Sequence, residues 1–274
     1  MGRPVVFLSD LGTRDEYVGV CRLVIERIAP GTSVIDLSHG VPPQDVLTGA
    51  TLLADGLPFM PANAVVLAVV DPGVGTDRRA IAIETEAGCA LVGPDNGLLS
   101  LAWPMLDGVR RVVEISSPDV VLASGSKVLD ARDVFAPAAA WLADGRPLES
   151  LGPPVDPASL LTRRLVEPDV ERHLIKGEVL DVDRFGNVRL NIRPADLERA
   201  DLHTQAELQV ATPAASTSAR RIATYHDVPE GEYGILVDAW RWLAIVRDEA
   251  RAADGLSAAP GDLVWIRSSD PTER

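Results

Sequence analysis

The sequence predicts an α/β domain with a mostly parallel sheet, followed by a smaller all-β domain that resembles a barrel. Three observations support this prediction. Apolar strand-like segments alternate with helical segments in the first half of the chain. Short strand-like segments with few helices between them fill the second half. Four prolines within residues 152–171 mark a linker between the halves, so we expect domains of 1–168 and 169–274.

In the first half, the expected elements follow one another in alternating order. Strands are expected at 5–8, 33–37, 64–70, 80–84, 90–92 and 111–115, and helices at 15–29, 44–54 and 131–143. The apolar run 64–70 has the length and β-branched content of a strand that is buried on both faces. Because strand–helix–strand connections are typical of parallel sheets, we expect a sheet with helices on both faces.

The second half changes character. Short strands are expected at 176–182, 188–192, 207–211, 233–237, 242–246 and 262–266. A series of this kind is typical of a small barrel or sandwich.

Composition excludes several classes of function. The 274 residues carry a formal net charge of −14, which disfavours binding to a nucleic-acid backbone. No apolar run approaches the roughly 18 residues of a membrane helix, and the N-terminal residues lack the pattern of a signal peptide. Cys21 and Cys89 are expected to be free thiols, which indicates a reducing, cytoplasmic location. The four histidines and two cysteines show no metal-ligand spacing, and no P-loop is present, so we expect neither a metal nor a cofactor.

Polar loops follow three of the expected strands. Asp10 closes the first strand, Asp71 begins the sequence DPGVG after the run 64–70, and Asn96 lies in GPDNG after 90–92. Ligand groups in α/β sheets usually lie at the carboxyl ends of strands. A carboxylate at such a place can accept both hydroxyls of a ribose. The alternative is that each acid only forms a turn or caps a helix.

Five segments together carry a family resemblance. They are FLSDLGTRDEYVG (7–19), DPGVGTDRR (71–79), GPDNGLLS (93–100), ARDVFAPAAA (131–140) and DRFGNVRLNI (183–192). In this order they resemble the S-adenosyl-L-methionine (SAM) hydroxide adenosyltransferases, also called adenosine-forming SAM hydrolases, which are related to fluorinase and chlorinase. The resemblance covers nearly the whole chain.

The resemblance implies a reaction and an assembly. The implied reaction is hydrolysis of SAM to adenosine and L-methionine by attack of water on C5′, with SAM as the substrate and no cofactor. The implied fold pairs an α/β domain with a β-barrel. The implied assembly is a homotrimer, in which SAM lies between the N-terminal domain of one subunit and the C-terminal domain of its neighbour.

The family's water-activating set is Asp-Arg-His, and the resemblance assigns the first two places to Asp71 and Arg78. The sulfonium of SAM is already activated, so what helps is a desolvated water held on the attack side. Asp71 could orient this water or accept its proton, while Arg78 fixes the carboxylate or donates to the oxygen. The alternative is a plain surface salt bridge. Halogenases of the family have a tyrosine in place of Asp71 and lack the arginine, so 5′-halogenation is disfavoured.

The third member of the set differs here. Residues 129–133 read LDARD where the family has FHGRD, so Asp130 stands in the place of the histidine. Either Asp130 takes a catalytic role, or it only caps the helix 131–143. Two close carboxylates would raise the pKa of one of them. Because of this difference, a SAM- or adenosine-binding protein without turnover is the alternative to an enzyme.

The remaining matches concern substrate binding. By resemblance, Asp10 holds the ribose hydroxyls, and Tyr225 stacks on the adenine. Also by resemblance, Asn96, Asp183, Phe185 and Asn187 contact the methionine end or pack around the substrate. The residues at 183–187 also read as a β-turn, because Gly-Asn is a strong turn dipeptide. Residues 238–241 and 248–251 replace the family's Asn-, Gly- and Ser-rich adenine loop, so adenine recognition is expected to differ.

Overall fold

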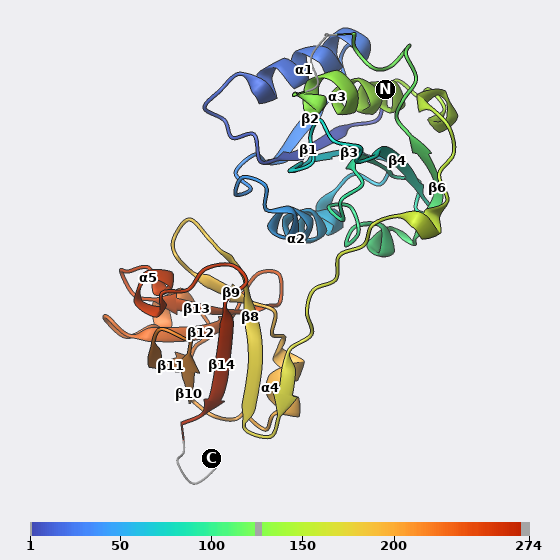
Figure 1. The fold of residues 1–274 in the computed structure, drawn as a ribbon. Coiled ribbons are helices and arrows are strands. Elements are labelled where there is room, and N and C mark those ends of the chain that lie inside the picture. Colours follow the sequence, from blue (N-terminus) through green and yellow to red (C-terminus); the bar gives the residue numbers. More distant parts are fainter. Residues whose placement is uncertain (1, 124–127, 270–274) are drawn as a thin grey trace. The chain divides into compact units, whose positions relative to one another are not determined.

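The computed structural model describes residues 2–123 and 128–269, and the chain divides into two compact units, Met1–Arg164 and Leu165–Arg274. The proline-rich segment that marks the expected boundary at residue 168 lies around this division. Figure 1 shows helices on both sides of a sheet in the first unit and strands wrapped around a core in the second.

A six-stranded sheet forms the centre of the first unit. Its order is β2–β1–β3–β5–β4–β6. The bounds are β1 Val5–Ser9, β2 Val34–Ser38, β3 Val65–Val69, β4 Ala80–Thr85, β5 Ala90–Pro94 and β6 Val109–Glu114. The pairs β1–β2, β1–β3 and β3–β5 are parallel, while β4 runs antiparallel to β5 and to β6. The predicted mostly parallel sheet is confirmed.

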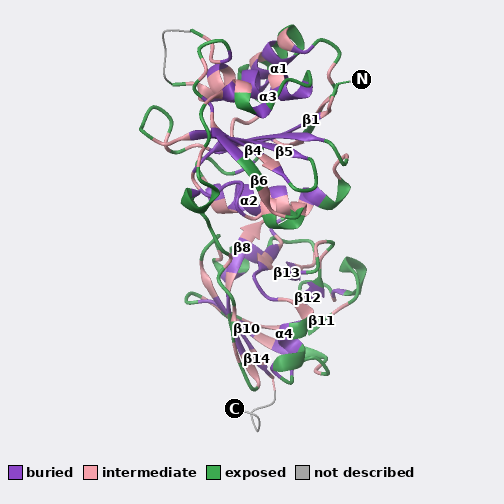
Figure 2. Ribbon diagram, turned by 90° about the vertical axis from the view of Figure 1, so that its right-hand side faces the viewer, coloured by how far each residue is buried: buried purple, intermediate pink, exposed green. Residues whose placement is uncertain are grey.

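Helices cover both faces of this sheet, as the alternating side chains of its buried strands require. Phe7 and Leu67 pack with α1 (Tyr17–Ile28) and α3 (Ala136–Ala143), whereas Leu8 and Val66 pack with α2 (Val46–Gly56). In Figure 2 the inner strands of the sheet are buried between helices whose outer sides are exposed, while the edge strand β6 is partly exposed. The one-turn helices of this unit are η1 Leu57–Phe59, η2 Trp103–Leu106, η4 Leu148–Leu151 and η5 Pro157–Ser159.

The helix expected at 131–143 begins differently from the prediction. Residues Ala131–Phe135 form a π-helical turn, η3, and the α-helix starts at Ala136. Pro137 has no N–H to donate to the carbonyl of Asp133, which instead accepts a hydrogen bond from Leu122 N at 2.8 Å. Such π turns frequently occur at functional sites.

The second unit is a closed barrel of seven strands. The order β14–β10–β11–β12–β13–β9–β8 closes because β14 also pairs with β8, and β7 extends the edge of β8. The bounds are β7 Asp169–Glu171, β8 Leu174–Val182, β9 Val188–Leu190, β10 Glu207–Ala211, β11 Ser216–Arg221, β12 Tyr233–Val237, β13 Leu243–Arg247 and β14 Leu263–Ser268. The predicted barrel is confirmed, although sequence reasoning missed β7, β11, η6 (Tyr225–Asp227) and the short helices α4 (Pro194–Arg199) and α5 (Ala252–Leu256).

Alternating apolar residues of these strands fill the interior of the barrel. Ile175 and Val179 of β8, Leu208 of β10, Ile245 of β13 and Ile266 of β14 are at most 2% exposed. Their neighbours along each strand point outward, as the twofold period of a strand requires. Within the part of the chain that the structure describes, no helix has the length and apolarity needed to span a membrane.

Candidate active site

Two carboxylates share one guanidinium at the end of β3. Asp71 follows this strand, Arg78 lies just before β4, and Asp130 lies just before η3. Arg78 donates from Nε to Asp71 Oδ1 at 3.0 Å, and from Nη2 to Asp71 Oδ2 and to Asp130 Oδ2, both at 2.5 Å. The three side chains are 6%, 11% and 20% exposed, in the order Asp71, Arg78, Asp130. The structure therefore brings the three predicted catalytic residues together.

The turn between β3 and β4 holds this cluster in place. Gly73 N donates to Asp71 Oδ1 at 3.2 Å, and Thr76 closes the turn by donating from Oγ1 to Gly73 O at 2.6 Å. The guanidinium carbon of Arg78 lies 5.1 Å from the centre of the Phe135 ring, a cation–π distance. Sequence reasoning missed Phe135, because an apolar residue in a helix gives no signal of such a contact.

The side chain of Asp130 does not cap its helix. Asp130 has helical backbone angles (φ −61°, ψ −25°), and its side chain makes no capping hydrogen bond. A capping residue needs extended backbone angles so that its side chain can turn back to the following N–H groups. The reading of Asp130 as only a helix cap is therefore wrong, because its carboxylate binds Arg78 instead.

The electrostatics of the cluster favour proton uptake by Asp71. Its pKa is raised, first by burial and then by the charge of Asp130, although Arg78 and the Gly73 N–H oppose the rise. One guanidinium faces two carboxylates, so the cluster carries a net negative charge when both are ionised. Such a site can orient a water molecule and accept its proton.

Asp10 lies at the same edge of the sheet as Asp71. It follows β1, the parallel neighbour of β3, and its N–H donates to Val69 O at 3.3 Å. Asp10 Oδ2 accepts from Gln44 N at 2.8 Å. Gln44 has a positive φ of 67°, and sequence reasoning did not single it out.

Asn96 lies next to the Asp71 turn, but its side chain is engaged within the chain. Asn96 Nδ2 donates to Val70 O at 2.8 Å, and Oδ1 accepts from Leu98 N at 3.0 Å. These bonds fix the backbone directly before Asp71. The structure thus gives Asn96 a structural task at the site, and its contact with substrate stays a prediction.

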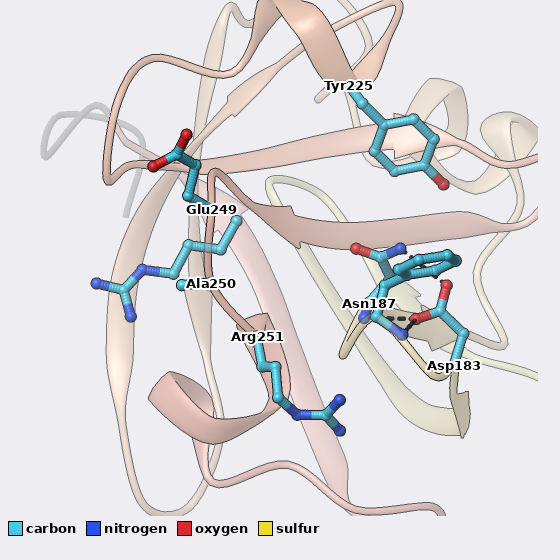
Figure 3. A pocket seen from close by; sticks show the side chains of 8 residues that line it. Asp183, Asn187, Tyr225, Glu249, Ala250 and Arg251 are labelled. Carbon is cyan, nitrogen blue, oxygen red and sulfur yellow. Dashed lines mark hydrogen bonds between the residues drawn. The ribbon is translucent and has the colours of Figure 1, made fainter.

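The predicted binding residues of the second unit line one pocket of about 580 Å³. They are Asp183, Phe185, Asn187 and Tyr225, and the other lining residues are Arg247, Glu249, Ala250 and Arg251. Figure 3 shows Asp183, Asn187 and Tyr225 on one side of this pocket, and Glu249, Ala250 and Arg251 on the other. Because Phe185 and Tyr225 are 67% and 59% exposed, their rings offer apolar surface on which a flat ligand can stack.

Asp183 organises the turn that carries these residues. Its Oδ1 accepts from Phe185 N at 2.8 Å and from Asn187 N at 2.9 Å, and its Oδ2 accepts from Asn187 Nδ2 at 2.8 Å. Gly186, with a φ of 85°, donates from its N–H to Asp183 O at 2.9 Å. The β-turn reading of this segment is thus confirmed, and the turn also presents side chains to the pocket.

A smaller, acidic pocket of about 140 Å³ adjoins the first and shares Asp183, Asn187 and Tyr225 with it. Arg189 there lies 3.2 Å from Asp181 Oδ2 and 2.9 Å from Asp238 Oδ2. Burial, followed by the charges of Asp183 and Asp238, raises the pKa of Tyr225. Carboxylates therefore outnumber the single arginine, which suits a cationic group of a ligand. Over the described ranges, 2–123 and 128–269, no group of three His, Cys, Asp or Glu residues is placed to hold a metal ion.

Family models match both units. Residues 5–152 match a model described as the SAM hydroxide adenosyltransferase N-terminal domain, and residues 177–265 match the corresponding C-terminal domain.

Individual proteins are similar over almost the whole chain. A Salinispora tropica protein named (R)-S-adenosyl-L-methionine hydrolase is 45% identical over 264 residues, which cover 96% of this chain and 97% of the relative. A fluorinase from an Actinoplanes species is more distant, with 27% identity over 92% of this chain and 93% of the relative. The crystal structure of an uncharacterized conserved protein from Thermotoga maritima matches with a TM-score of 0.87 and 33% identity, over 96% of this chain and 100% of that one.

Proposed function

The chain belongs to the SAM hydroxide adenosyltransferase family, and from this premise we propose that it hydrolyses SAM to adenosine and L-methionine. The observation that carries the proposal is the cluster of Asp71, Arg78 and Asp130. It places two carboxylate acceptors, joined by one guanidinium donor and largely shielded from solvent, at the carboxyl end of a buried strand.

The reaction is a displacement at C5′ of the adenosyl group. The oxygen of water forms a bond to C5′, and the C5′–S bond breaks with its electron pair going to sulfur. Methionine leaves as a neutral thioether, so no acid has to protonate the leaving group. The second proton of the attacking water goes to Asp71, which Arg78 holds in position, and then to solvent.

The substrate-binding residues have separate tasks. Asp10 accepts the ribose hydroxyls with its carboxylate. The acidic end of the second-unit pocket suits the ammonium of the methionine part, and the rings of Phe185 and Tyr225 suit the adenine. Asn96 keeps the Asp71 turn in place beside the substrate.

Water is preferred over halide as the nucleophile. An ionised Asp71 repels a halide, but it attracts the hydrogen atoms of a water molecule. The more distant relationship to a fluorinase agrees with this preference. The remaining competitor is a SAM-binding protein without turnover, because an ionised Asp130 cannot donate a hydrogen bond as a histidine can.

Incubation of the purified protein with SAM in ¹⁸O-labelled water tests the proposal. We expect labelled oxygen on C5′ of adenosine and an equal amount of L-methionine, both detected by mass spectrometry. Because the Salinispora relative is named for the (R) form of SAM, the two sulfonium epimers are supplied separately. SAM that binds but stays intact beyond its spontaneous decay would establish the binding-only alternative.

We further propose that the active form is a homotrimer in the cytoplasm, with SAM held by the N-terminal unit of one subunit and the C-terminal unit of its neighbour. The candidate residues support this arrangement, because they are divided between the two units of the chain. The two cysteines are buried and free, in agreement with a reducing compartment.

Mixing two inactive variants tests the shared site. Asp71→Asn damages the first unit, and the double variant Phe185→Ala/Tyr225→Ala removes two exposed rings from the second. Random mixed trimers contain sites with both halves intact, so about one quarter of the wild-type activity is expected to return after subunit exchange. A mixture of Asp71→Asn with Arg78→Lys is the control and should stay inactive. A monomeric mass in solution, or no recovery, would contradict the arrangement.

Asp130→Asn is expected to move the acid limb of the kcat/KM profile to lower pH. The charge of Asp130 helps to raise the pKa of Asp71, and the variant removes this charge. Activity requires ionised Asp71 and therefore rises as the pH passes through its pKa, so a lower pKa shifts the rise downward. Asp107→Asn, at an exposed position with a φ of 63°, serves as the control. A limb that stays in place would show that Asp130 does not act on the ionising group.

A further inference from the structure

A buried hydrogen bond between Ser9 and His39 lies next to Asp10, and His39 is within ion-pair distance of the exposed Asp36; we call these three side chains the His39 network. Ser9, the last residue of β1, places Oγ 2.7 Å from His39 Nδ1, and His39 Nε2 lies 3.2 Å from Asp36 Oδ1 in β2. Ser9 and His39 are 0% and 5% exposed. Sequence reasoning gave His39 only a structural interpretation.

The contacts within the His39 network assign a donor and an acceptor role to each group. Because His39 Nε2 lies 3.2 Å from a carboxylate oxygen, the favoured tautomer has its proton on Nε2 and leaves Nδ1 as an acceptor. The Ser9 hydroxyl therefore donates to Nδ1, and Ser9 Oγ in turn accepts from Leu11 N at 3.3 Å. Arg22 pairs with Asp36 at the outer end. Burial raises the pKa of Asp36, but the interactions with Arg22 and His39 outweigh this effect, and the pKa is lowered. Asp36 therefore stays an ionised carboxylate that faces His39.

The order Asp-His-Ser resembles that of a nucleophilic triad, but this serine cannot attack a substrate. Ser9 is fully buried, and its lone pair is directed to the Leu11 N–H. The His39 network binds the backbone after Asp10 instead. His39 O accepts from Gly12 N at 2.9 Å, so the backbone of His39 and the side chain of Ser9 hold the two residues that follow Asp10.

Asp10 is thus fixed from several sides. Its N–H donates to Val69 O, and one of its carboxylate oxygens accepts from Gln44 N. The next two N–H groups along the backbone donate to Ser9 Oγ and to His39 O. A carboxylate that accepts two neighbouring hydroxyls must keep its plane fixed, since both bonds depend on one orientation. If the loop after β1 were less well fixed, the bonds from Asp10 to the two ribose hydroxyls would weaken.

We propose that His39 is a positioning residue that acts through Ser9 to orient the Asp10 carboxylate toward the ribose hydroxyls of the substrate. The inference rests on the proposed function, in which Asp10 binds these hydroxyls. It predicts that loss of the His39–Ser9 bond affects recognition of the ribose and leaves the Asp71 cluster unchanged.

Two variants of His39 separate positioning from simple stability. In His39→Asn, the amide oxygen takes the place of Nδ1 and can accept from Ser9, whereas in His39→Gln the longer amide reaches toward Asp36 and loses Ser9. Ser9→Ala removes the same bond from the other side. Val6→Ala, in the buried part of β1, is the control, because it destabilises the fold and leaves Ser9, His39 and Asp36 unchanged.

The readout is the preference for SAM over its 2′-deoxy analogue. The wild type should prefer SAM by about 10- to 100-fold in kcat/KM, as one hydrogen bond to a charged group implies. His39→Gln and Ser9→Ala should reduce this preference to less than about threefold, while His39→Asn and Val6→Ala keep most of it. Calorimetry gives the dissociation constants of SAM and of its 2′-deoxy analogue. Their ratio measures the same preference without any need for turnover.

The outcomes separate the two proposals. If His39→Gln and Ser9→Ala lower the melting temperature but keep the wild-type preference in both ratios, the positioning role is wrong. If the wild type binds SAM without forming adenosine, the hydrolase proposal fails, and the ratio of dissociation constants still decides the role of His39. If the wild type shows no preference for the 2′-hydroxyl, the inference is overturned even when adenosine is formed.

Discussion

Asp71→Asn should reduce the rate of adenosine formation by about 10²- to 10⁴-fold, the usual contribution of a general base. The amide keeps the shape of the side chain and one acceptor oxygen for Arg78, but it cannot take a proton from water. SAM affinity should change little, because the proposed mechanism assigns Asp71 to the attacking water and not to the substrate's polar groups. Single-turnover rates and SAM dissociation constants, measured on the same preparation, check both statements.

A matched exchange of Asp for Asn at an exposed site provides the control. Asp107 is exposed and has left-handed backbone angles that asparagine tolerates, so Asp107→Asn should leave the rate unchanged. If Asp71→Asn loses SAM affinity in proportion to its rate, Asp71 is a binding residue. If its rate stays within a few-fold of the wild type, another group handles the water.

The sequence is sufficient to predict the elements whose apolar pattern is strong. The run that becomes β3 is buried along its whole length, and its composition alone indicates this. β11 reads STSARR, in which only Ala219 is buried, and it is a strand because β10 and β12 pair with it on either side. No local propensity could show this, because the pairing depends on closure of the barrel.

The candidate site likewise has a part that the local sequence predicts and a part that only the fold brings together. Asp71 and Arg78 are seven residues apart on one turn, so their pairing follows from local sequence. Asp130 joins them from 52 residues away in the chain, and the sequence alone left open whether it caps a helix. The helical backbone angles of Asp130 decide this, and those angles depend on the π turn that follows. Tyr225 meets Asp183 in the same pocket only because the strands of the barrel bring η6 beside the β8–β9 turn.

Arg78→Met is expected to abolish activity and to lower the free energy of unfolding by about 3–5 kcal/mol, as breaking a buried ion pair does. The methionine fills the space of the arginine stem, but it leaves two nearly buried carboxylates without their shared cation. Asp71 then resists ionisation more strongly, so its pKa in the folded state rises further. Chemical unfolding at neutral pH measures the loss.

The pH dependence of this loss has a definite sign. A carboxylate whose pKa is higher in the folded than in the unfolded state destabilises the fold as the pH rises through that pKa. The deficit of Arg78→Met should therefore be small in acid, where Asp71 is protonated, and largest at neutral pH. Arg111→Met is the control, because the Arg111 side chain is 48% exposed and solvent screens its ion pairs with Glu84 and Glu149, so the loss of stability should be much smaller.

A compensating variant separates the two roles of Arg78. In Arg78→Met/Asp71→Asn/Asp130→Asn, no buried charge is left without a partner, so most of the lost stability should return. Activity should not return, because neither the base nor its positioning cation is present. If the triple variant stays as unstable as Arg78→Met, the guanidinium stabilises the fold through its packing on Phe135 and not through the carboxylates. If Arg78→Met alone keeps wild-type stability, the buried cluster is not the tightly coupled unit that its geometry indicates, and Asp71 must act without it.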